Sequence, residues 1–159
     1  MLEPTYQIRT AEERELDQVE NINLRCLPEN YSRFFYLDIL HRFPKAFLVA
    51  IKNGVVAGYI MCRVERGFSE LRRFGISKKG HIVSVAVLPE HQRKGIGKGL
   101  VEKALEGMIN YGAGESYLEV RISNEPAIDL YKKLGFNIIR RIVGYYRDGE
   151  DAYVMAKKE

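Results

Sequence analysis

Apolar residues recur with two different periods along this chain. Runs rich in β-branched and aromatic residues, bounded by glycine, proline, asparagine or aspartate, predict short strands. The clearest two runs, 46–51 and 55–61, are separated by Asn53-Gly54, which predicts a hairpin closed by a primed turn. Strands are predicted at 6–9, 46–51, 55–61, 81–88, 116–121, 136–139, 142–146 and 152–156, where 136–139 and 142–146 are one strand or two halves of one.

Helical spacing of apolar residues predicts four helices. The first begins at Thr10, which has the capping-box relation to Glu13, and it ends before Pro28. The others are predicted at about 32–42, between Gly97 and Gly112, and from the N-cap residue Asn124 to Gly135.

The order of these elements predicts the fold class. Strand 81–88, the third helix and strand 116–121 follow one another, so a right-handed crossover should make the two strands parallel and neighbouring. We therefore expect an α/β protein of mixed α+β type, with one mostly antiparallel sheet of six to seven strands and four helices. A length of 159 residues suits one domain, 1–159, with its own core.

Composition narrows the classes of partner. The formal net charge of +4 is mildly basic, and acidic residues are spread among the basic ones, which favours an anionic cofactor and makes a nucleic-acid partner unlikely. The stretch 67–80 reads as a polar loop whose basic residues, like Arg140 and Arg141, are expected to be solvated surface, with ribosome or partner docking as the alternative. These loop residues are Arg72, Arg73, Lys78 and Lys79.

Neither cysteine suggests a disulfide or a metal. Cys26 and Cys62 lie far apart without metal-ligand spacing, so both are expected to be reduced and buried, and no metal is predicted. We find no signal peptide and no apolar run of the roughly 20 residues that a membrane span needs. The expected location is the cytoplasm.

The stretch 92–97, Gln-Arg-Lys-Gly-Ile-Gly, lies between a strand and a helix. Its glycines leave backbone N–H groups uncovered at a positive helix end, a combination that binds phosphate, although isolated glycines often only ease a turn. A nucleotide-triphosphate loop would need Ser or Thr after Lys98, where Gly99 stands. A dinucleotide fingerprint fits poorly, because Pro89 to Lys94 separate the strand from the glycines.

Coenzyme A is a third possible phosphate ligand, and here the chain resembles a known family. Residues 92–97 are similar to the Q/R-x-x-G-x-G/A signature of the GCN5-related N-acetyltransferases (GNAT), and 124–136 is similar to their second motif. The resemblance implies the GNAT fold, with acetyl-CoA as cofactor at a splayed parallel strand pair. The residues expected to bind it are Val85, Ala86, Val87, Gln92, Arg93, Lys94, Gly95, Ile96, Gly97, Lys98, Asn124 and Tyr131.

Three further segments narrow the resemblance within this family. Residues 27–31, 117–124 and 144–153 are similar to the catalytic subunit of N-terminal acetyltransferase A and its archaeal relatives. This implies acetylation of protein N-terminal α-amines, with a ribosome or an auxiliary subunit as a possible further partner. The residues that would contact the peptide are Leu27, Pro28, Glu29, Tyr31, Tyr145 and Tyr146.

The chemistry needs a neutral amine and a proton for the departing thiolate. An α-amine with a pKa near 8 is already about one-tenth neutral at pH 7, so weak base catalysis suffices. Strand alternation lets His81 and Glu119 converge near the amine. We predict that Glu29, His81 and Glu119 remove the amine's proton, directly or through water, and that Tyr131 protonates the coenzyme A sulfur.

Each of these residues also has a structural interpretation. His81 could serve as a hydrogen-bonded strand residue, Glu119 could form an ion pair with Arg121 or another basic neighbour, and Tyr131 could be a core aromatic. Alternative functions are acetylation of lysine side chains or a small amine on the same fold, a non-catalytic acetyl-CoA sensor, and an RNA-associated subunit.

Overall fold

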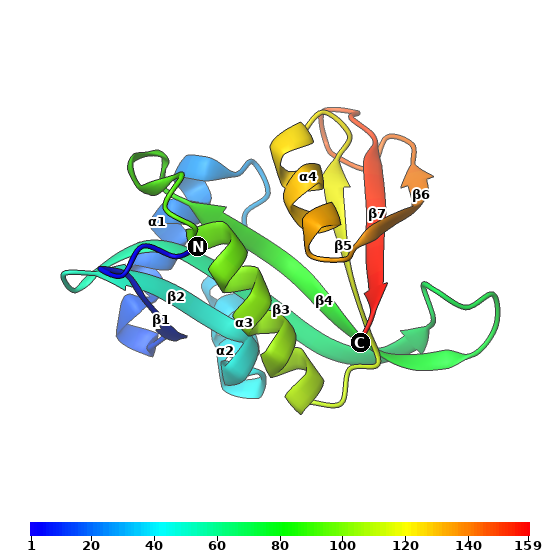
Figure 1. Ribbon diagram of the computed structural model, residues 1–159, viewed down its shortest axis with the longest axis horizontal. Helices are drawn as coiled ribbons and strands as arrows, with labels where there is room; N and C mark the ends of the chain where they lie inside the picture. Colours follow the sequence, from blue (N-terminus) through cyan, green and yellow to red (C-terminus); the bar gives the residue numbers. More distant parts are fainter. The chain divides into compact units, whose positions relative to one another are not determined.

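Seven strands form a mixed sheet with the order β1-β2-β3-β4-β5-β7-β6, accompanied by four α-helices (Figure 1). The computed structural model describes all residues, 1–159. The chain divides into two compact units, Met1–Arg63 with Ile82–Tyr111, and Val64–His81 with Gly112–Glu159. Strands β3 and β4 run through both units. The predicted fold class is confirmed.

The first unit contains most of the helices. Its strands are β1 (Gln7–Thr10), β2 (Phe47–Lys52), β3 (Val55–Phe68) as far as Arg63, and β4 (Ile76–Val87) from Ile82. Its helices are α1 (Leu16–Cys26), α2 (Arg33–Arg42) and α3 (Ile96–Asn110), with short 3-10 turns at Glu13–Glu15, Pro44–Ala46 and Pro89–His91. Figure 1 shows α3 in front of the strands of this unit and α1 and α2 behind them.

The β2–β3 hairpin forms the centre of the first unit. Asn53 and Gly54 have φ angles of 52° and 76°, the left-handed conformation that a type I′ turn requires, so the predicted primed turn is confirmed. Strand β2 pairs with β1 on one side and β3 on the other, both antiparallel, and five of its residues are buried in succession. This is the pattern of a strand covered on both faces.

The second unit contains the parallel strand pair. Its further elements are β5 (Glu115–Arg121), α4 (Glu125–Lys133), β6 (Asn137–Ile142) and β7 (Ala152–Lys158). Residues Lys79–His81 of β4 pair in parallel with Glu115–Tyr117 of β5, as predicted from the crossover. Strand β7 pairs antiparallel with β5 and with β6.

Three sequence predictions about elements are wrong. The polar loop predicted at 67–80 is confined to 69–75, because β3 extends to Phe68 and β4 begins at Ile76. The first α-helix does not start at Thr10. Glu15 instead binds Arg9 and the Glu12 backbone N–H (2.9 Å), which creates a 3-10 turn before α1. Residues 143–146 form a turn and not a strand, since Asp151 accepts from the Gly144 N–H (2.8 Å).

Two smaller features complete the comparison with the sequence. Helix α3 buries Leu100, Val101, Ala104, Leu105 and Met108, whereas the apolar Ile109 is 49% exposed. None of the helices combines the length and the apolar character that crossing a membrane requires.

The surroundings of two glycines in α3 predict opposite effects of substitution by alanine on stability. A Cβ at Gly107 would lie 2.0 Å from the backbone oxygen of Lys45, so the helix and the chain before β2 could not keep their spacing. We expect Gly107→Ala to lower the free energy of unfolding by about 2–3 kcal/mol in urea denaturation. At Gly99 the only close atom is the flexible Cδ1 of Ile8 (2.8 Å), so Gly99→Ala should be neutral or stabilising by up to about 1 kcal/mol. Equal losses in both variants would contradict this explanation.

Candidate functional site

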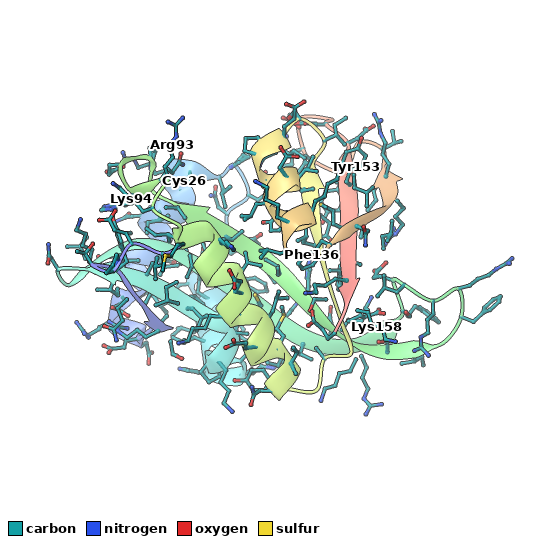
Figure 2. All side chains as sticks on the ribbon, in the orientation of Figure 1. Cys26, Arg93, Lys94, Phe136, Tyr153 and Lys158 are labelled. Carbon is teal, nitrogen blue, oxygen red and sulfur yellow. The ribbon has the colours of Figure 1, made fainter.

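The N-terminus of α3 is built to receive an anion. Gly95 is the N-cap residue with φ of +80°, and no side chain caps the free N–H groups of the first turn, which contains no acidic residue. Arg93 also takes a left-handed φ of 64°. Figure 2 shows Arg93 and Lys94 at the loop that leads into α3. A helix start of this kind can bind an anion, and the phosphate role of residues 92–97 stays a prediction.

Further contacts hold this loop to its own unit. Gln92 Nε2 donates to the Val87 carbonyl (3.3 Å), which connects the loop to the end of β4. Lys94 lies 3.3 Å from Glu3 and Lys98 lies 4.0 Å from Glu102, so both cations already face a surface carboxylate. These exposed pairs are weak, and a phosphate could displace them.

The end of β4 alternates in burial. Ser84 and Ala86 are buried, whereas Val83, Val85 and Val87 are partly exposed, as the predicted strand alternation requires. Cys26 of α1 places its Sγ 3.9 Å from the Val87 carbonyl oxygen. Burial raises the pKa of the Cys26 thiol, and the fully buried Cys62 has its pKa raised more strongly by the same cause. Both cysteines are free thiols.

A buried amide positions the loop between α1 and α2. Asn23, 1% exposed, donates from Nδ2 to the Glu29 backbone oxygen (3.0 Å) and to the Tyr59 hydroxyl (3.0 Å). Its Oδ1 accepts from Asn30 Nδ2 (2.8 Å). The Tyr59 hydroxyl in turn lies 2.6 Å from Ser84 Oγ on β4. Because Asn23 has both donors and its acceptor engaged, the backbone at Glu29 is fixed relative to β4.

Burial keeps the Tyr59 hydroxyl of this network from ionising. Burial raises the pKa of Tyr59 to about 12, although the hydrogen bonds with Ser84 and Asn23 act in the opposite direction. Tyr59 therefore stays a neutral hydrogen-bonding group at physiological pH. Tyr31, at the end of the loop, stacks on Phe35 (5.1 Å between ring centroids) and donates from its hydroxyl to the Val83 carbonyl (3.4 Å).

An open pocket of about 460 Å³ lies between α1 and α2. Its two carboxylates, Asp17 and Glu20, both bind Arg33. The Tyr36 hydroxyl is buried there without a partner, and burial raises its pKa. The pocket is lined by Asp17, Glu20, Asn21, Asn23, Leu24, Asn30, Tyr31 and Tyr36, which include Tyr31 but none of the predicted catalytic residues.

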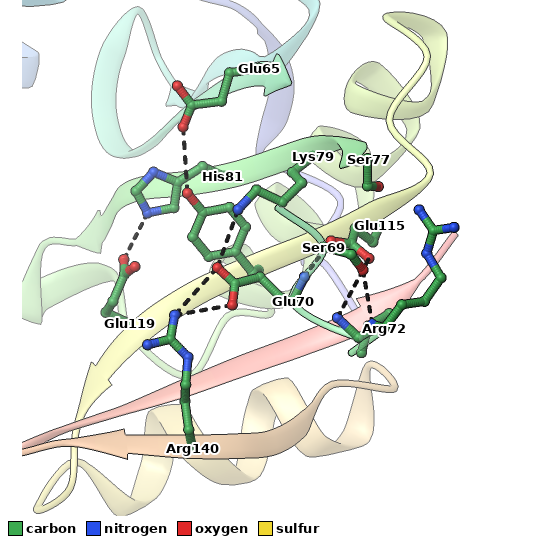
Figure 3. A network of polar contacts seen from close by, with 12 residues as sticks. Glu65, Ser69, Glu70, Arg72, Ser77, Lys79, His81, Glu115, Glu119 and Arg140 are labelled. Carbon is green, nitrogen blue, oxygen red and sulfur yellow. Dashed lines mark hydrogen bonds and ion pairs between the residues drawn. The ribbon is translucent and has the colours of Figure 1, made fainter. Parts of the chain in front are cut away.

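In the second unit, His81 and Glu119 converge as strand alternation predicted. His81 Nε2 and Glu119 Oε1 are 2.7 Å apart (Figure 3). Glu119 therefore pairs with this histidine, whereas Arg121 binds Asp148 and Glu150 instead. The other ring nitrogen, Nδ1, is buried and has no partner in the protein. With a proton on Nε2 donated to the carboxylate, Nδ1 carries a free lone pair.

The His81 ring is held in place by Tyr117. The two rings stack with centroids 4.4 Å apart and planes only 4° from parallel. The Tyr117 hydroxyl donates to Glu65 (3.5 Å), and the Lys79 ammonium lies 4.6 Å from the same ring. Lys79 also binds Glu70, which accepts from Arg140 as well (Figure 3). The orientation of the imidazole is thus fixed by contacts on β3, β4 and β5.

Helix α4 contains the other predicted cofactor residues. Asn124 is its N-cap and accepts from the Ala127 N–H (3.3 Å), so the predicted cap is confirmed and this oxygen is engaged within the protein. Tyr131 is 6% exposed and packs edge-to-face on Phe136. The Tyr131 ring is therefore a core aromatic, and the catalytic role of its hydroxyl stays a prediction.

The turn between β6 and β7 presents the paired tyrosines. Tyr145 and Tyr146 pack edge-to-face with centroids 5.0 Å apart, and Tyr145 is 47% exposed. Arg121 places its guanidinium 4.1 Å from the centre of the Tyr146 ring while binding Asp148 and Glu150. Arg121 thus holds the turn against the end of β5.

The candidate residues divide between the two units. The first unit holds the residues at 27–31, 85–87 and 92–98, and the second holds His81, Glu119, Asn124, Tyr131 and the Tyr145-Tyr146 turn. Sequence reasoning missed the supporting residues Asn23, Tyr59, Ser84, Tyr117, Glu65 and Arg121. One signal was available, because Asn23 follows Ile22 of the apolar stripe, and a polar residue at the edge of such a stripe is either exposed or fully hydrogen-bonded.

The sheet is mixed and contains one parallel strand pair, and the helix that follows β4 begins at a glycine without a side-chain cap. This combination defines a class of acyl-transferring proteins. The acetyltransferase (GNAT) family model matches residues 16–136, and the chain belongs to this family.

Three relatives make the likeness more specific. An N-alpha-acetyltransferase of Sulfurisphaera tokodaii is 50% identical over 153 residues, covering 95% of this chain and 92% of the relative. The N-terminal acetyltransferase A complex catalytic subunit NAA10 of Arabidopsis thaliana is 38% identical over 153 residues, covering 94% and 76%. A chain in the crystal structure of the NatC complex bound to Gag peptide and CoA superposes with a TM-score of 0.86 at 25% identity, covering 97% and 98%. The predicted resemblance is confirmed.

The hydrogen bonds of Asn23 predict that its substitution lowers stability and activity, whereas substitution of the neighbouring Asn21 should not. Asn23→Ala leaves the Glu29 carbonyl and the Tyr59 hydroxyl without this partner, so we expect unfolding in urea to require about 2–3 kcal/mol less. Acetylation of a peptide should also slow, because the 27–31 loop loses its anchor. Asn21→Ala, on the exposed side of the same helix, should change neither quantity by more than about 0.5 kcal/mol. Similar effects in both variants would argue against a positioning role.

Proposed function

We propose that this chain transfers the acetyl group of acetyl-CoA to the α-amino group of protein N-termini, in the cytoplasm, with residues 1–159 acting as one acetyltransferase domain. The bond between His81 and Glu119 carries the proposal, because a carboxylate-oriented imidazole beside an acceptor amine is suited to take its proton. Relatives named N-alpha-acetyltransferase at 50% identity support the same activity.

The residues at α3 fit the cofactor. The first-turn N–H groups lack a side-chain cap, no acidic residue lies in that turn, and Arg93, Lys94 and Lys98 supply positive charge. We assign the pyrophosphate to this cradle and the pantetheine arm to the backbone of Val85, Ala86 and Val87. When bound, acetyl-CoA supplies an activated acetyl thioester. Asn124 and Tyr131 complete the predicted cofactor contacts.

The acceptor side is assigned to the loop and turn residues. Leu27, Pro28, Glu29 and Tyr31 would form one wall around the incoming N-terminus, and Tyr145 and Tyr146 would hold its backbone. Asn23 fixes the position of Glu29, and Arg121 fixes Tyr146.

The hydrogen bond between His81 and Glu119 indicates which ring nitrogen accepts the proton of the amine. Glu119 accepts from His81 Nε2, so Nδ1 is the basic nitrogen, and it takes a proton from the amine directly or through water, with Glu29 as a second acceptor. The Glu119 carboxylate then stabilises the imidazolium. The Tyr131 hydroxyl gives its proton to the coenzyme A sulfur. Tyr117 keeps the imidazole in its plane and acts as a positioning residue.

Peptides that differ only at the N-terminus test the acceptor. With a free N-terminus and one internal lysine, mass spectrometry should place the acetyl group on the α-amine. Blocking the N-terminus should abolish transfer, because the lysine amine is neutral in only about one molecule in several thousand at pH 7. Equal rates on both peptides would establish the alternative, a lysine or small-amine acetyltransferase. Cofactor binding without transfer to any peptide would indicate a sensor.

Substitution of the proposed bases tests the mechanism. We expect Glu29→Gln, and separately the double variant His81→Ala, Glu119→Ala, to reduce kcat by about 10²–10⁴. Binding of coenzyme A by calorimetry should stay within about twofold, since neither change touches the α3 cradle. His41→Ala, which removes an exposed histidine, is the control and should leave kcat unchanged. Full turnover by both test variants would falsify the base assignment.

Action with an auxiliary subunit or at the ribosome is compatible with this proposal. The NatC structure is a complex, and the present chain is proposed to act on peptides without a partner. Assays with the purified chain alone, as above, distinguish these cases.

A further inference from the structure

The net charge of the chain is concentrated in one hairpin. Residues 66–79 contain five basic side chains and a single acidic one, Glu70, which gives this segment a net charge of +4, the formal charge of the whole chain. The remaining residues are therefore neutral in sum. We call residues 66–79, the end of β3, its turn and the start of β4, the basic hairpin. Figure 1 shows it as a long green hairpin.

The one carboxylate of the hairpin is turned inward. The Glu70 side chain is 12% exposed and binds Lys79 (3.2 Å) and Arg140 (3.0 Å) (Figure 3). Its backbone N–H, with the Ser69 hydroxyl, donates to the buried Glu115 (2.7 and 2.8 Å). The turn is thereby anchored, and the exposed basic side chains of the hairpin have no acidic neighbour within it. They are Arg66, Arg72, Arg73 and Lys78.

Exposed apolar groups share a face with these cations. The Ser69 N–H donates to the Gly75 carbonyl (3.1 Å), which places Phe68 opposite Ile76 in the antiparallel ladder. By strand alternation Arg66 lies on the same face as Phe68. Phe68 is 80% exposed and Ile76 is 66% exposed. With Phe74 at the turn, three large exposed apolar side chains gather on this one hairpin, and grouped apolar exposure is what marks an interaction surface.

The turn repeats the combination of ring and guanidinium. Phe74 is 80% exposed, and the Arg73 guanidinium lies 5.5 Å from the centre of its ring. Arg72 donates to the Ile76 carbonyl (3.1 Å), which holds it along the strand. Aromatic rings alternate with guanidinium groups from Arg66 to Phe74.

We propose that the basic hairpin binds single-stranded RNA. Arginines pair with phosphates, and exposed phenylalanine rings stack on unpaired bases, which is how sequence-tolerant single-strand binders combine charge and aromatic groups. An anionic membrane fits less well, because cations interrupt the apolar groups along both strands and leave no continuous apolar face. The inference is independent of acetyl transfer and revises the expectation, drawn from the balanced overall composition, that nucleic acid is not a partner.

The test compares matched variants by fluorescence anisotropy with a labelled oligouridine of about twelve nucleotides, a length within the range that single-strand sites cover. Phe68→Leu, Phe74→Leu keeps the apolar character but removes the rings, and should weaken binding by about tenfold. Arg66→Gln, Arg73→Gln should reduce the slope of log affinity against log salt by about 1.4, that is, two phosphate contacts. Lys132→Gln, Lys133→Gln removes the same charge from the exposed surface of α4 and should change affinity by less than about twofold.

Several outcomes would overturn the proposal. Equal weakening by the α4 control would show that only net charge matters, and unchanged binding by the leucine variant would exclude stacking. Tighter binding to duplex RNA, to phosphatidylserine vesicles or to polyglutamate than to the oligouridine would assign the hairpin to another partner. Absence of binding at low salt would also reject it. Peptide acetylation without RNA should be the same in every variant, which confirms that each one folds.

Discussion

The side-chain amide of Asn23 is the interaction on which the first unit depends. It connects the α1–α2 loop, the hydroxyl of Tyr59 on β3 and, through that hydroxyl, Ser84 on β4. All of these side chains are buried, so none can exchange its partner for water without exposing the core. A loop of ordinary composition is in this way given the rigidity of the sheet beneath it. Precise placement of a carboxylate is what acid–base chemistry requires of its scaffold.

The second unit solves a similar problem with charge and aromatic stacking. His81 lies between a carboxylate at its edge and the face of Tyr117, while Lys79, Glu70 and Arg140 form the neighbouring ion pairs. Each carboxylate is paired, which lets several ionisable groups lie close together at low solvent exposure. The fold by itself does not fix the chemistry, which depends on the side chains that the strands bring together.

The sequence predicted features that depend on local rules. Asn53-Gly54 specified its turn and Asn124 capped α4, because backbone conformation at these positions is decided by neighbouring residues. Thr10 failed as a cap because Arg9 attracts Glu15, a contact beyond the first turn. The loop prediction for residues 67–80 was too long because the polar side chains at both ends of this segment belong to paired strands. Asn23, Tyr117 and Arg121 were missed because the side chains that they bind, Tyr59, Glu65 and Asp148, lie far away in the sequence. Only Asn23 gave a signal, as a polar residue beside an apolar stripe.

Cys26 gives the proposed site a chemical safeguard. Its thiol faces the Val87 carbonyl, in the strand end assigned to the pantetheine arm, and burial raises its pKa. With the pantetheine arm at this strand end, each turnover would release coenzyme A, itself a free thiol, near this cysteine. Disulfide exchange requires a thiolate, so a cysteine kept protonated reacts slowly with oxidised forms of the product. The raised pKa of Cys26 thus disfavours a mixed disulfide between the proposed site and its own product.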